Sequence, residues 1–237
     1  MSVGIVKQSA QSAEQNFPDP DLNRTITLHR APASDIGLAL VLKRATDVII
    51  SSALLLALSP VLALTAAAIK LTSAGPVFFR QQRYGLNNKQ FTILKFRTMF
   101  THETDMSGVK QTRVGDPRIT PLGRFLRRTN IDELPQLINV LQGDMSLVGP
   151  RPHVPGMRAG GMIYEALVPS YFERHRVRPG LTGLAQINEL RGSTADAKFA
   201  RARIAYDLAY IEHWSILLDL RILWTTLKTE VLRGTGN

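Results

Sequence analysis

The 237-residue chain contains no cysteine, and several common catalytic motifs are absent as well. Without cysteine it forms no disulfide, thiolate zinc site or iron–sulfur cluster, and it has no cysteine nucleophile. It also lacks the P-loop, G-x-G-x-x-G, H-E-x-x-H and G-x-S-x-G patterns. ATP hydrolysis, dinucleotide chemistry and zinc proteolysis therefore lose support. The five histidines show no metal-ligand spacing, and His153 and His175 suit packing or surface roles better than substrate contacts.

Basic residues are in excess: 29 Lys and Arg stand against 19 Asp and Glu, which gives a formal charge of +10. A chain this basic is expected to bind an anionic partner, which is a nucleic acid, a phospholipid surface or a phosphorylated substrate. The hydrophobic content of 44% is enough for a buried core. Composition does not choose among the three partners, but the distribution of apolar residues does.

Residues 48–69 form an uncharged run of 22 residues, which follows a polar stretch without periodicity over 1–36. We interpret 1–36 as a mobile tail, and not as a secretory signal, because no basic start leads directly into an apolar run. At about 1.5 Å per residue, the uncharged run is just long enough to cross a hydrocarbon core of about 30 Å. The run therefore predicts a membrane segment.

The middle of this segment contains Ser59-Pro60, and both of its flanks are basic. Proline removes a backbone donor and bends a helix, and a serine hydroxyl nearby can bind the freed carbonyl. Basic residues on both sides place both ends on the cytoplasmic face. We therefore predict a re-entrant membrane hairpin over 41–71, which dips into the bilayer and returns. A straight span kinked at Pro60 and a buried core helix are the alternatives.

The remainder, 72–237, is predicted to be a cytoplasmic catalytic domain, so that the whole is an α+β, mostly helical, monotopic membrane fold. Residues 76–82 and 91–97 are predicted to pair as a small β-hairpin. A polar loop follows over about 101–116, and Thr120-Pro121 is typical of a helix start. Further helices are expected over about 135–142 and at the end of the chain. There an apolar stripe that includes Leu220, Trp224 and Leu227 faces either lipid headgroups or the core.

Asp132 and Glu133 are the carboxylates best placed for chemistry, because they lie just before Pro135. Proline disfavours the α conformation at Leu134, so a helix that begins at Pro135 would point its free N–H groups toward the pair. One carboxylate could attack phosphorus while the other holds a divalent cation that screens the phosphates. The alternative is a structural one, in which the two acidic residues only complete the cap of a helix.

Arginine and lysine residues around this pair favour phosphate binding, because the planar guanidinium donates two parallel hydrogen bonds. Two prolines flank Arg151 and restrict its backbone. The other candidates lie on the expected hairpin, on the helix before the pair and in the Arg178-Pro179-Gly180 turn: Lys95, Arg97, Arg127 and Arg178. Together with a membrane segment, these residues indicate a phosphate-rich substrate at the bilayer surface.

Several motifs in sequence order resemble one known family. They are KRATDVIISSALLLALSPVLAL, GPVFFRQQRYG, KFRTM, LGRFLRRTNIDELPQLINVLQGDMSLVGPRP, RPGLTG and the late Tyr206-Asp207 with Trp214 and Asp219-Leu220. Between about Lys43 and Leu232 the chain is similar to the bacterial sugar transferases, the monotopic polyprenyl-phosphate phosphoglycosyl transferases. The resemblance implies transfer of a sugar 1-phosphate from a UDP-sugar to undecaprenyl phosphate, with release of UMP, at the cytoplasmic face of the bacterial inner membrane. This step initiates exopolysaccharide or another lipid-linked glycan.

The resemblance also assigns roles to particular residues. Asp132 matches the nucleophile, which would form a phospho-sugar intermediate, and Glu133 the Mg²⁺-binding partner. Arg127 matches a phosphate-binding arginine, Arg151 the arginine of a Pro-Arg-Pro motif and Lys95 the lysine of a K-F-R-[ST]-M element. Asp219 matches a late acidic position. Leu184 departs from the tryptophan of many relatives, which affects the expected sugar or lipid selectivity. The hexose is expected to be glucose or galactose.

Three other interpretations stay open on the sequence. Transfer could be direct, in a ternary complex with Asp132 as the base. A membrane-tethered nucleic-acid-binding protein would use the basic surface, but we expect no nucleic-acid partner, because no zinc finger or RNP motif is present. A noncatalytic scaffold would recruit other glycan enzymes. Every interpretation that includes a membrane segment makes membrane lipid an expected partner. A homodimer is possible, but the sequence does not determine the oligomeric state.

Overall fold

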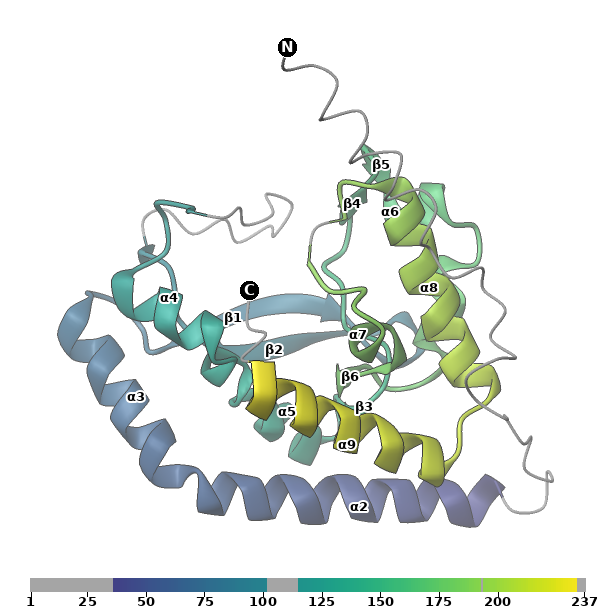
Figure 1. The fold of residues 1–237 in the computed structure, drawn as a ribbon, viewed down its shortest axis with the longest axis horizontal. Coiled ribbons are helices and arrows are strands. Elements are labelled where there is room, and N and C mark those ends of the chain that lie inside the picture. Colours follow the sequence, from purple (N-terminus) through teal and green to yellow (C-terminus); the bar gives the residue numbers. More distant parts are fainter. Residues whose placement is uncertain (1–35, 102–114, 193, 234–237) are drawn as a thin grey trace.

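The computed structural model describes residues 36–101, 115–192 and 194–233 (Figure 1). The predicted tail, except for its last residue, and most of the predicted polar loop lie outside these residues. Helix α2, Ile36–Ala57, runs along one side of the molecule, and α3, Ser59–Thr72, leaves its end at an angle (Figure 1). The first helix thus begins five residues before the predicted boundary at 41.

The break between α2 and α3 lies where Ser59-Pro60 predicts it. The two helices meet at 61°. In a continuous helix the N–H of residue 60 would bond the carbonyl of Leu56, and proline has no N–H. The Ser59 hydroxyl donates to that carbonyl instead, at 2.8 Å. By length and apolar composition, none of the described helices qualifies alone as a membrane span, whereas this bent pair qualifies as a unit.

The predicted hairpin is present as strands β1, Phe78–Tyr84, and β2, Gln90–Phe96. They pair antiparallel, with Phe78 opposite Phe96 and Tyr84 opposite Gln90. The alternating apolar residues of β2 bury Phe91 and Ile93 against the core. Lys95 lies on the same face as Phe91 and Ile93, two residues further along the strand, where its side chain reaches Glu133 instead of the apolar core.

The rest of the chain consists of short elements followed by two long helices. They are α4 (Pro121–Arg128), η5 (Ile131–Glu133), α5 (Gln136–Gln142), β3 (Ser146–Val148), β4 (Arg158–Ala159), β5 (Met162–Ile163), α6 (Tyr164–Leu167), η6 (Tyr171–Arg176), β6 (Gly180–Thr182), α7 (Leu184–Ile187), α8 (Ala197–Glu212) and α9 (Ile216–Arg233). Strand β3 pairs parallel with β6, so the turn that contains Arg178 leads into a strand. A side chain on Gly180 would overlap the backbone of Gly149, so only glycine fits this close approach.

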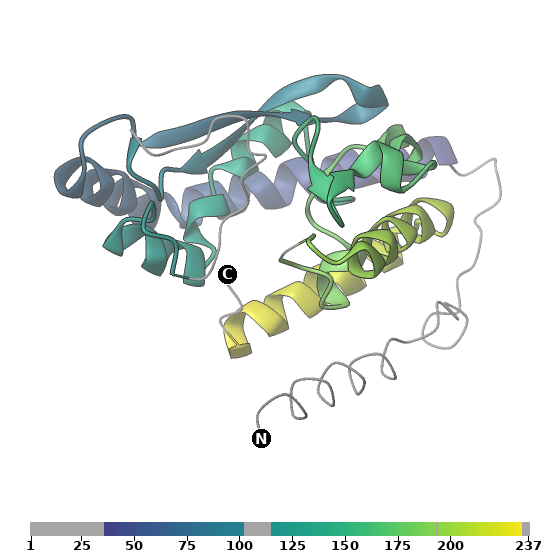
Figure 2. The same cartoon turned by 90° about the horizontal axis from the view of Figure 1, so that it is seen from above.

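Seen from above, β1 and β2 lie on one side of the molecule and α8 and α9 on the other (Figure 2). The main core lies between them and includes Leu137, Val140, Met145, Leu184 and Ile222. Because Leu184 is buried there, the residue that departs from the family pattern packs inside the domain.

Helix α9 turns two different faces to its surroundings. Leu218 and Ile222 are buried in the core. Leu220, Trp224 and Leu227 are exposed, so core packing is wrong for these three residues, whereas Leu223 of the same stripe packs partly buried against the core. The exposed residues of α9 thus include several large apolar side chains beside Arg221 and Lys228, which is unusual for a surface that meets only water.

Candidate active site

Asp132 and Glu133 lie on a single 3-10 turn, η5, that follows a left-handed residue. Asn130 has φ 54° and ψ 14°, which turns the chain sharply after α4. Leu134 then has φ −57° and ψ −34°, so the expectation that proline keeps it out of the α region is wrong. The N–H of Leu134 donates to the carbonyl of Ile131, and the turn continues directly into α5. Neither acidic side chain caps this turn or helix, so the structural alternative of a helix cap finds no support.

The side chain of Asn139 aligns this turn with the hairpin. From α5, its Oδ1 accepts from the N–H of Leu94 at 2.9 Å, and its Nδ2 donates to the carbonyl of Thr92 at 2.8 Å. The amide thereby pairs with β2 as a neighbouring strand would. As a result, Lys95 on β2 faces η5. Sequence reasoning missed Asn139, because one asparagine in an apolar helix gives no sign of its partner.

Glu133 is held by two cations at once. The Lys95 ammonium donates to Oε1 at 2.6 Å. The Arg151 guanidinium donates to both carboxylate oxygens, to Oε2 at 3.1 Å and to Oε1. Burial by itself raises the pKa of Glu133, but Arg151 and Lys95 overcome it and hold that pKa well below its usual range. Glu133 is therefore a fixed anion.

Asp132 has a different environment, although it is the adjacent residue. Within the described residues, no hydrogen bond or ion pair joins its carboxylate to another group. Burial raises its pKa to about 6, against the opposing charge of Lys95. A buried carboxylate without partners is more basic and better able to react than one bound by cations.

Arg127 completes the cationic surroundings of the pair. Its Nε donates to the Thr98 hydroxyl at 2.8 Å, and its charge lowers the pKa of Asp132. Helix α4 can approach Thr98 because Gly123 has no side chain, since a Cβ there would overlap the Thr98 carbonyl. The predicted start of α4 is confirmed, with the Thr120 hydroxyl accepting from the N–H of Gly123.

Two predicted binding residues lie elsewhere. Arg97 is buried, and its guanidinium donates to the carbonyls of Ser73 and Ala74, so it caps the end of α3. Arg178 donates to the carbonyl of Gly143 at 2.8 Å, after the end of α5. Both side chains bind backbone and lie apart from the acidic pair.

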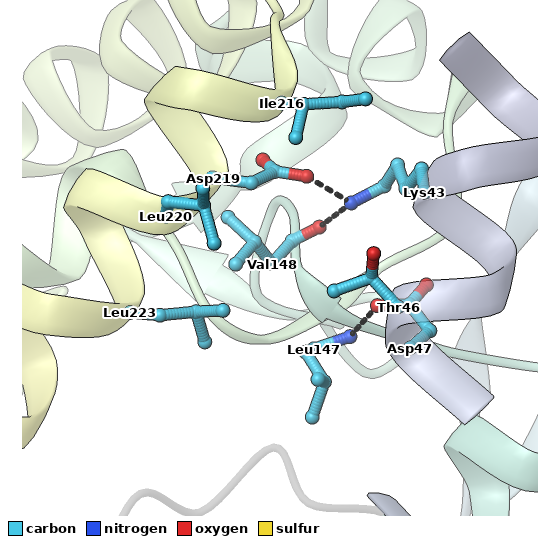
Figure 3. A pocket seen from close by; sticks show the side chains of 9 residues that line it. All are labelled: Lys43, Thr46, Asp47, Leu147, Val148, Ile216, Asp219, Leu220 and Leu223. Carbon is cyan, nitrogen blue, oxygen red and sulfur yellow. Dashed lines mark hydrogen bonds and ion pairs between the residues drawn. The ribbon is translucent and has the colours of Figure 1, made fainter. Parts of the chain in front are cut away.

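Asp219 also lies apart from the pair, in a small pocket between α2 and α9 (Figure 3). The Lys43 ammonium donates to its Oδ2 at 2.6 Å and to the carbonyl of Val148 at 3.1 Å. The Tyr210 hydroxyl and the Trp214 indole N–H also donate to Asp219. On the next turn of α2, Asp47 accepts from the N–H of Leu147 (Figure 3). We name these contacts of Lys43 and Asp47 the α2 latch, because they fasten that helix to β3 and α9.

The side chains at this site could bind a divalent cation only if a substrate supplied further ligands. No group of three or more His, Asp or Glu side chains gathers anywhere in the described ranges. Glu133 Oε1 already accepts from two cations, whereas Oε2 accepts one hydrogen bond at 3.1 Å and has lone pairs left. Mg²⁺ is usually bound by one or two carboxylates together with phosphate oxygens and water. The donors therefore suit an ion that arrives with a phosphorylated substrate.

Two carboxylates surrounded by Lys95, Arg127 and Arg151 form a site whose charges suit an enzyme that acts on phosphate groups. The chain belongs to the bacterial sugar transferase family, whose sequence pattern matches residues 38–233. It is 57% identical to an exopolysaccharide production protein of Rhizobium leguminosarum bv. phaseoli, over 83% of this chain and 98% of that one. It is 50% identical to an undecaprenyl-phosphate glucose phosphotransferase of Komagataeibacter xylinus, and 46% identical to a UDP-glucose:undecaprenyl-phosphate glucose-1-phosphate transferase of Escherichia coli. These two alignments cover 86% and 85% of this chain but only 38% and 42% of those longer proteins.

Proposed function

We propose that this chain transfers a hexose 1-phosphate, with glucose as the first candidate, from a UDP-sugar to undecaprenyl phosphate and releases UMP. The observation that carries the proposal is the unequal environment of the two carboxylates. Glu133 is bound by Lys95 and Arg151, and Asp132 has no such partner in the described part of the chain. Both relatives named as glucose phosphotransferases act, by their names, on undecaprenyl phosphate.

In the first step, a carboxylate oxygen of Asp132 attacks the β-phosphorus of the UDP-sugar. The new Asp132–phosphorus bond forms as the bond from the β-phosphorus to the bridging oxygen breaks, and UMP leaves with the electron pair. Lys95, Arg127 and Arg151 supply positive charge near the phosphates, which stabilises the charge that develops on the leaving group.

In the second step, a phosphate oxygen of undecaprenyl phosphate attacks the same phosphorus. The bond to Asp132 breaks, the carboxylate is restored and a lipid-linked sugar diphosphate leaves. One site therefore serves both half-reactions in turn. A ternary complex with Asp132 as the base is the alternative within the same reaction class.

Glu133 is the residue that would hold Mg²⁺, through Oε2 and with substrate phosphates as the other ligands. The ion would neutralise phosphate charge during transfer. The protein's own contribution is to keep Glu133 ionised and in place, since Lys95 and Arg151 bind it from two sides. The low pKa of Glu133 means that the ion would not have to compete with a proton at neutral pH.

We also propose that α2 and α3 enter the cytoplasmic leaflet as a re-entrant pair and that the exposed side of α9 meets the same membrane. Support comes from large apolar side chains that are exposed on all three helices. They include Val41, Ile49, Leu56 and Leu64 on α2 and α3, and Leu217, Leu220, Trp224 and Leu227 on α9. A soluble surface rarely exposes so many, whereas a lipid surface removes them from water. A water-soluble nucleotide and a very apolar lipid phosphate could then meet at one site.

The proposal is tested by UMP release from a panel of UDP-sugars, with undecaprenyl phosphate, Mg²⁺ and detergent-solubilised full-length protein. We expect release from one donor that depends on lipid and Mg²⁺ and is lost in Asp132→Asn. No release from any donor by folded protein would contradict the proposal and favour a scaffold.

A further inference from the structure

The four residues Pro150–His153, which include Arg151, are held by their backbone carbonyls from several sides. Because the two prolines have no N–H, these carbonyls are most of the segment's backbone polar groups. Each accepts a hydrogen bond from another element. The four bonds are Gly180 N to Pro150 O at 2.9 Å, Arg174 Nη2 to Arg151 O at 2.6 Å, Arg83 Nη1 to Pro152 O at 3.2 Å and Tyr84 N to His153 O at 3.0 Å.

Arg174, the donor to the Arg151 carbonyl, is itself held by a buried ion pair. Arg174 lies on η6, and its side chain is only 1% exposed. Its Nε and Nη2 both donate to Oδ2 of Asp207 on α8, at 2.9 and 2.6 Å. The guanidinium is thus fixed in one plane by Asp207 and offers Nη2 to the carbonyl of Arg151 as well.

A side chain can be aimed only as accurately as its own backbone is fixed. The Arg151 side chain is 38% exposed, so solvent and not packing surrounds much of it. Its guanidinium nevertheless has to meet both oxygens of Glu133 and leave donors for a phosphate. A misplacement of about 1 Å in such a site can cost about 10²-fold in rate.

We propose that Arg174 and Asp207 are positioning residues for sugar-phosphate transfer, because their buried ion pair fixes the Arg151 carbonyl and thereby aims its guanidinium at Glu133 and the substrate phosphates. Asp207 acts only through Arg174, and neither residue is assigned a contact with substrate. The inference rests on the proposed function and deepens it. A purely structural ion pair would instead stabilise the fold without a specific link to Arg151.

A double-mutant cycle separates these two roles. Arg174→Lys keeps the charge but loses the fork that binds Asp207 and Arg151 together. We expect it, and Asp207→Asn, to lower kcat for UMP release about 10- to 100-fold in folded protein. In the Arg151→Met background the aimed side chain is already absent. Adding Arg174→Lys or Asp207→Asn there should lower kcat by less than about a further twofold.

Arg203→Lys is the matched control, because Arg203 is also a buried arginine, on the same helix as Asp207. Its guanidinium donates to the carbonyls of Leu190 and Gly192 and not to the Pro150–His153 segment. We expect this variant to lose stability but to keep kcat within about twofold of wild type. Thermal unfolding and far-UV circular dichroism of every variant supply the folded fraction that normalises kcat. If Asp207→Asn does not fold, the Arg174→Lys arm carries the same cycle.

The outcomes are distinct. If the wild type is active and each change lowers kcat by the same factor in the Arg151→Met background as in wild type, the positioning role is overturned and the proposed function stays intact. Equal losses in Arg203→Lys and Arg174→Lys would also overturn it, because general destabilisation would then explain both. No UMP release by folded wild type from any donor would overturn the proposed function and this inference together.

Discussion

Two regions of this molecule differ in which side chains they expose to water. Around Glu133 and Arg174, acidic and basic side chains form ion pairs that are buried or partly buried: Glu133 with Lys95 and Arg151, and Arg174 with Asp207. On the outer sides of α2, α3 and α9, apolar side chains such as Leu56, Leu64 and Trp224 are exposed to solvent. Charges are normally outside and apolar groups inside, so each region departs from the rule for soluble domains.

The difference indicates that the two regions serve different ligands. Buried, paired charges cost stability to maintain, but they bind phosphate groups more strongly than exposed charges do, because little water screens them. Exposed apolar helices are unfavourable in water and favourable against lipid. The α2 latch joins the regions, since Lys43 and Asp47 fasten the apolar helix to β3, two residues before Pro150.

The largest effect is expected at Asp132. Asp132→Asn keeps the size of the side chain and removes its charge, so it should lower kcat for UMP release by about 10⁴-fold. Asp144→Asn, at an acidic residue just after α5, is the matched control and should stay within about twofold. Retention of a tenth or more of wild-type activity in Asp132→Asn would contradict the role of Asp132.

A smaller loss is expected at Glu133. Glu133→Gln removes the anion between Lys95 and Arg151, so both cations lose their partner and the Mg²⁺ ligand is weakened. We expect kcat to fall about 10²- to 10³-fold and the Mg²⁺ concentration for half-maximal rate to rise. An unchanged Mg²⁺ dependence would show that another group binds the ion.

The apolar region is tested by placing a charge on it. Leu56 is 78% exposed, so Leu56→Lys removes little core packing but places an ammonium group in the proposed membrane face. We expect the share of protein recovered with membranes, against that in solution, to fall about 10- to 100-fold. Gln142→Lys, at an exposed residue at the end of α5, should not change this ratio. Equal recovery of both variants with membranes would contradict the proposal that α2 enters the membrane.

The α2 latch should affect stability more than substrate binding. Asp219→Asn weakens a part-buried ion pair with Lys43, so the free energy of unfolding should fall by about 1 to 3 kcal/mol. The KM for the UDP-sugar should change by less than about twofold. A large rise in KM without loss of stability would return Asp219 to the substrate-binding set that the sequence predicts.

The smallest effect concerns acid stability. Burial lowers the pKa of His175 to about 3 in the folded protein, with a further contribution from Arg174. As the pH falls below about 6.5, the unfolded chain binds a proton there and the folded protein does not. Stability is therefore full above that pH and is lost at up to about 1.4 kcal/mol per pH unit below it. His175→Gln should have a shallower slope between pH 6.5 and 5 in denaturant unfolding, and an identical slope would contradict this burial effect.

Local signals in the sequence predict much of the fold. Proline at residue 60, the predicted hairpin strand over 91–97 and Thr120-Pro121 are local signals of this kind, and the structure contains a break, a strand and a capped helix at these places. The conformation of Leu134 is wrong in the prediction, because the turn η5 and its continuation into α5 outweigh the preference of a residue before proline.

The site is predicted only where its residues lie close together in the sequence. Asp132 and Glu133 stand side by side, and prolines around Arg151 make it conspicuous. Arg97 and Arg178 look equally suitable in the sequence, yet they bind backbone carbonyls elsewhere. Asn139 and Arg174 were missed because their partners are 23 or more residues away along the chain. Such pairings depend on the tertiary fold, which no local pattern specifies.

The central claim, that Asp132 is the free nucleophile beside a fixed Glu133, is tested most directly by intact-protein mass spectrometry. Wild type is incubated with Mg²⁺ and the UDP-sugar that supports UMP release, without lipid, and quenched in acid. The account predicts a mass increase of one hexose phosphate, mapped to Asp132, absent in Asp132→Asn and removed by later addition of undecaprenyl phosphate. UMP release that occurs only when lipid is present, with no adduct at any time, would contradict it and favour direct transfer.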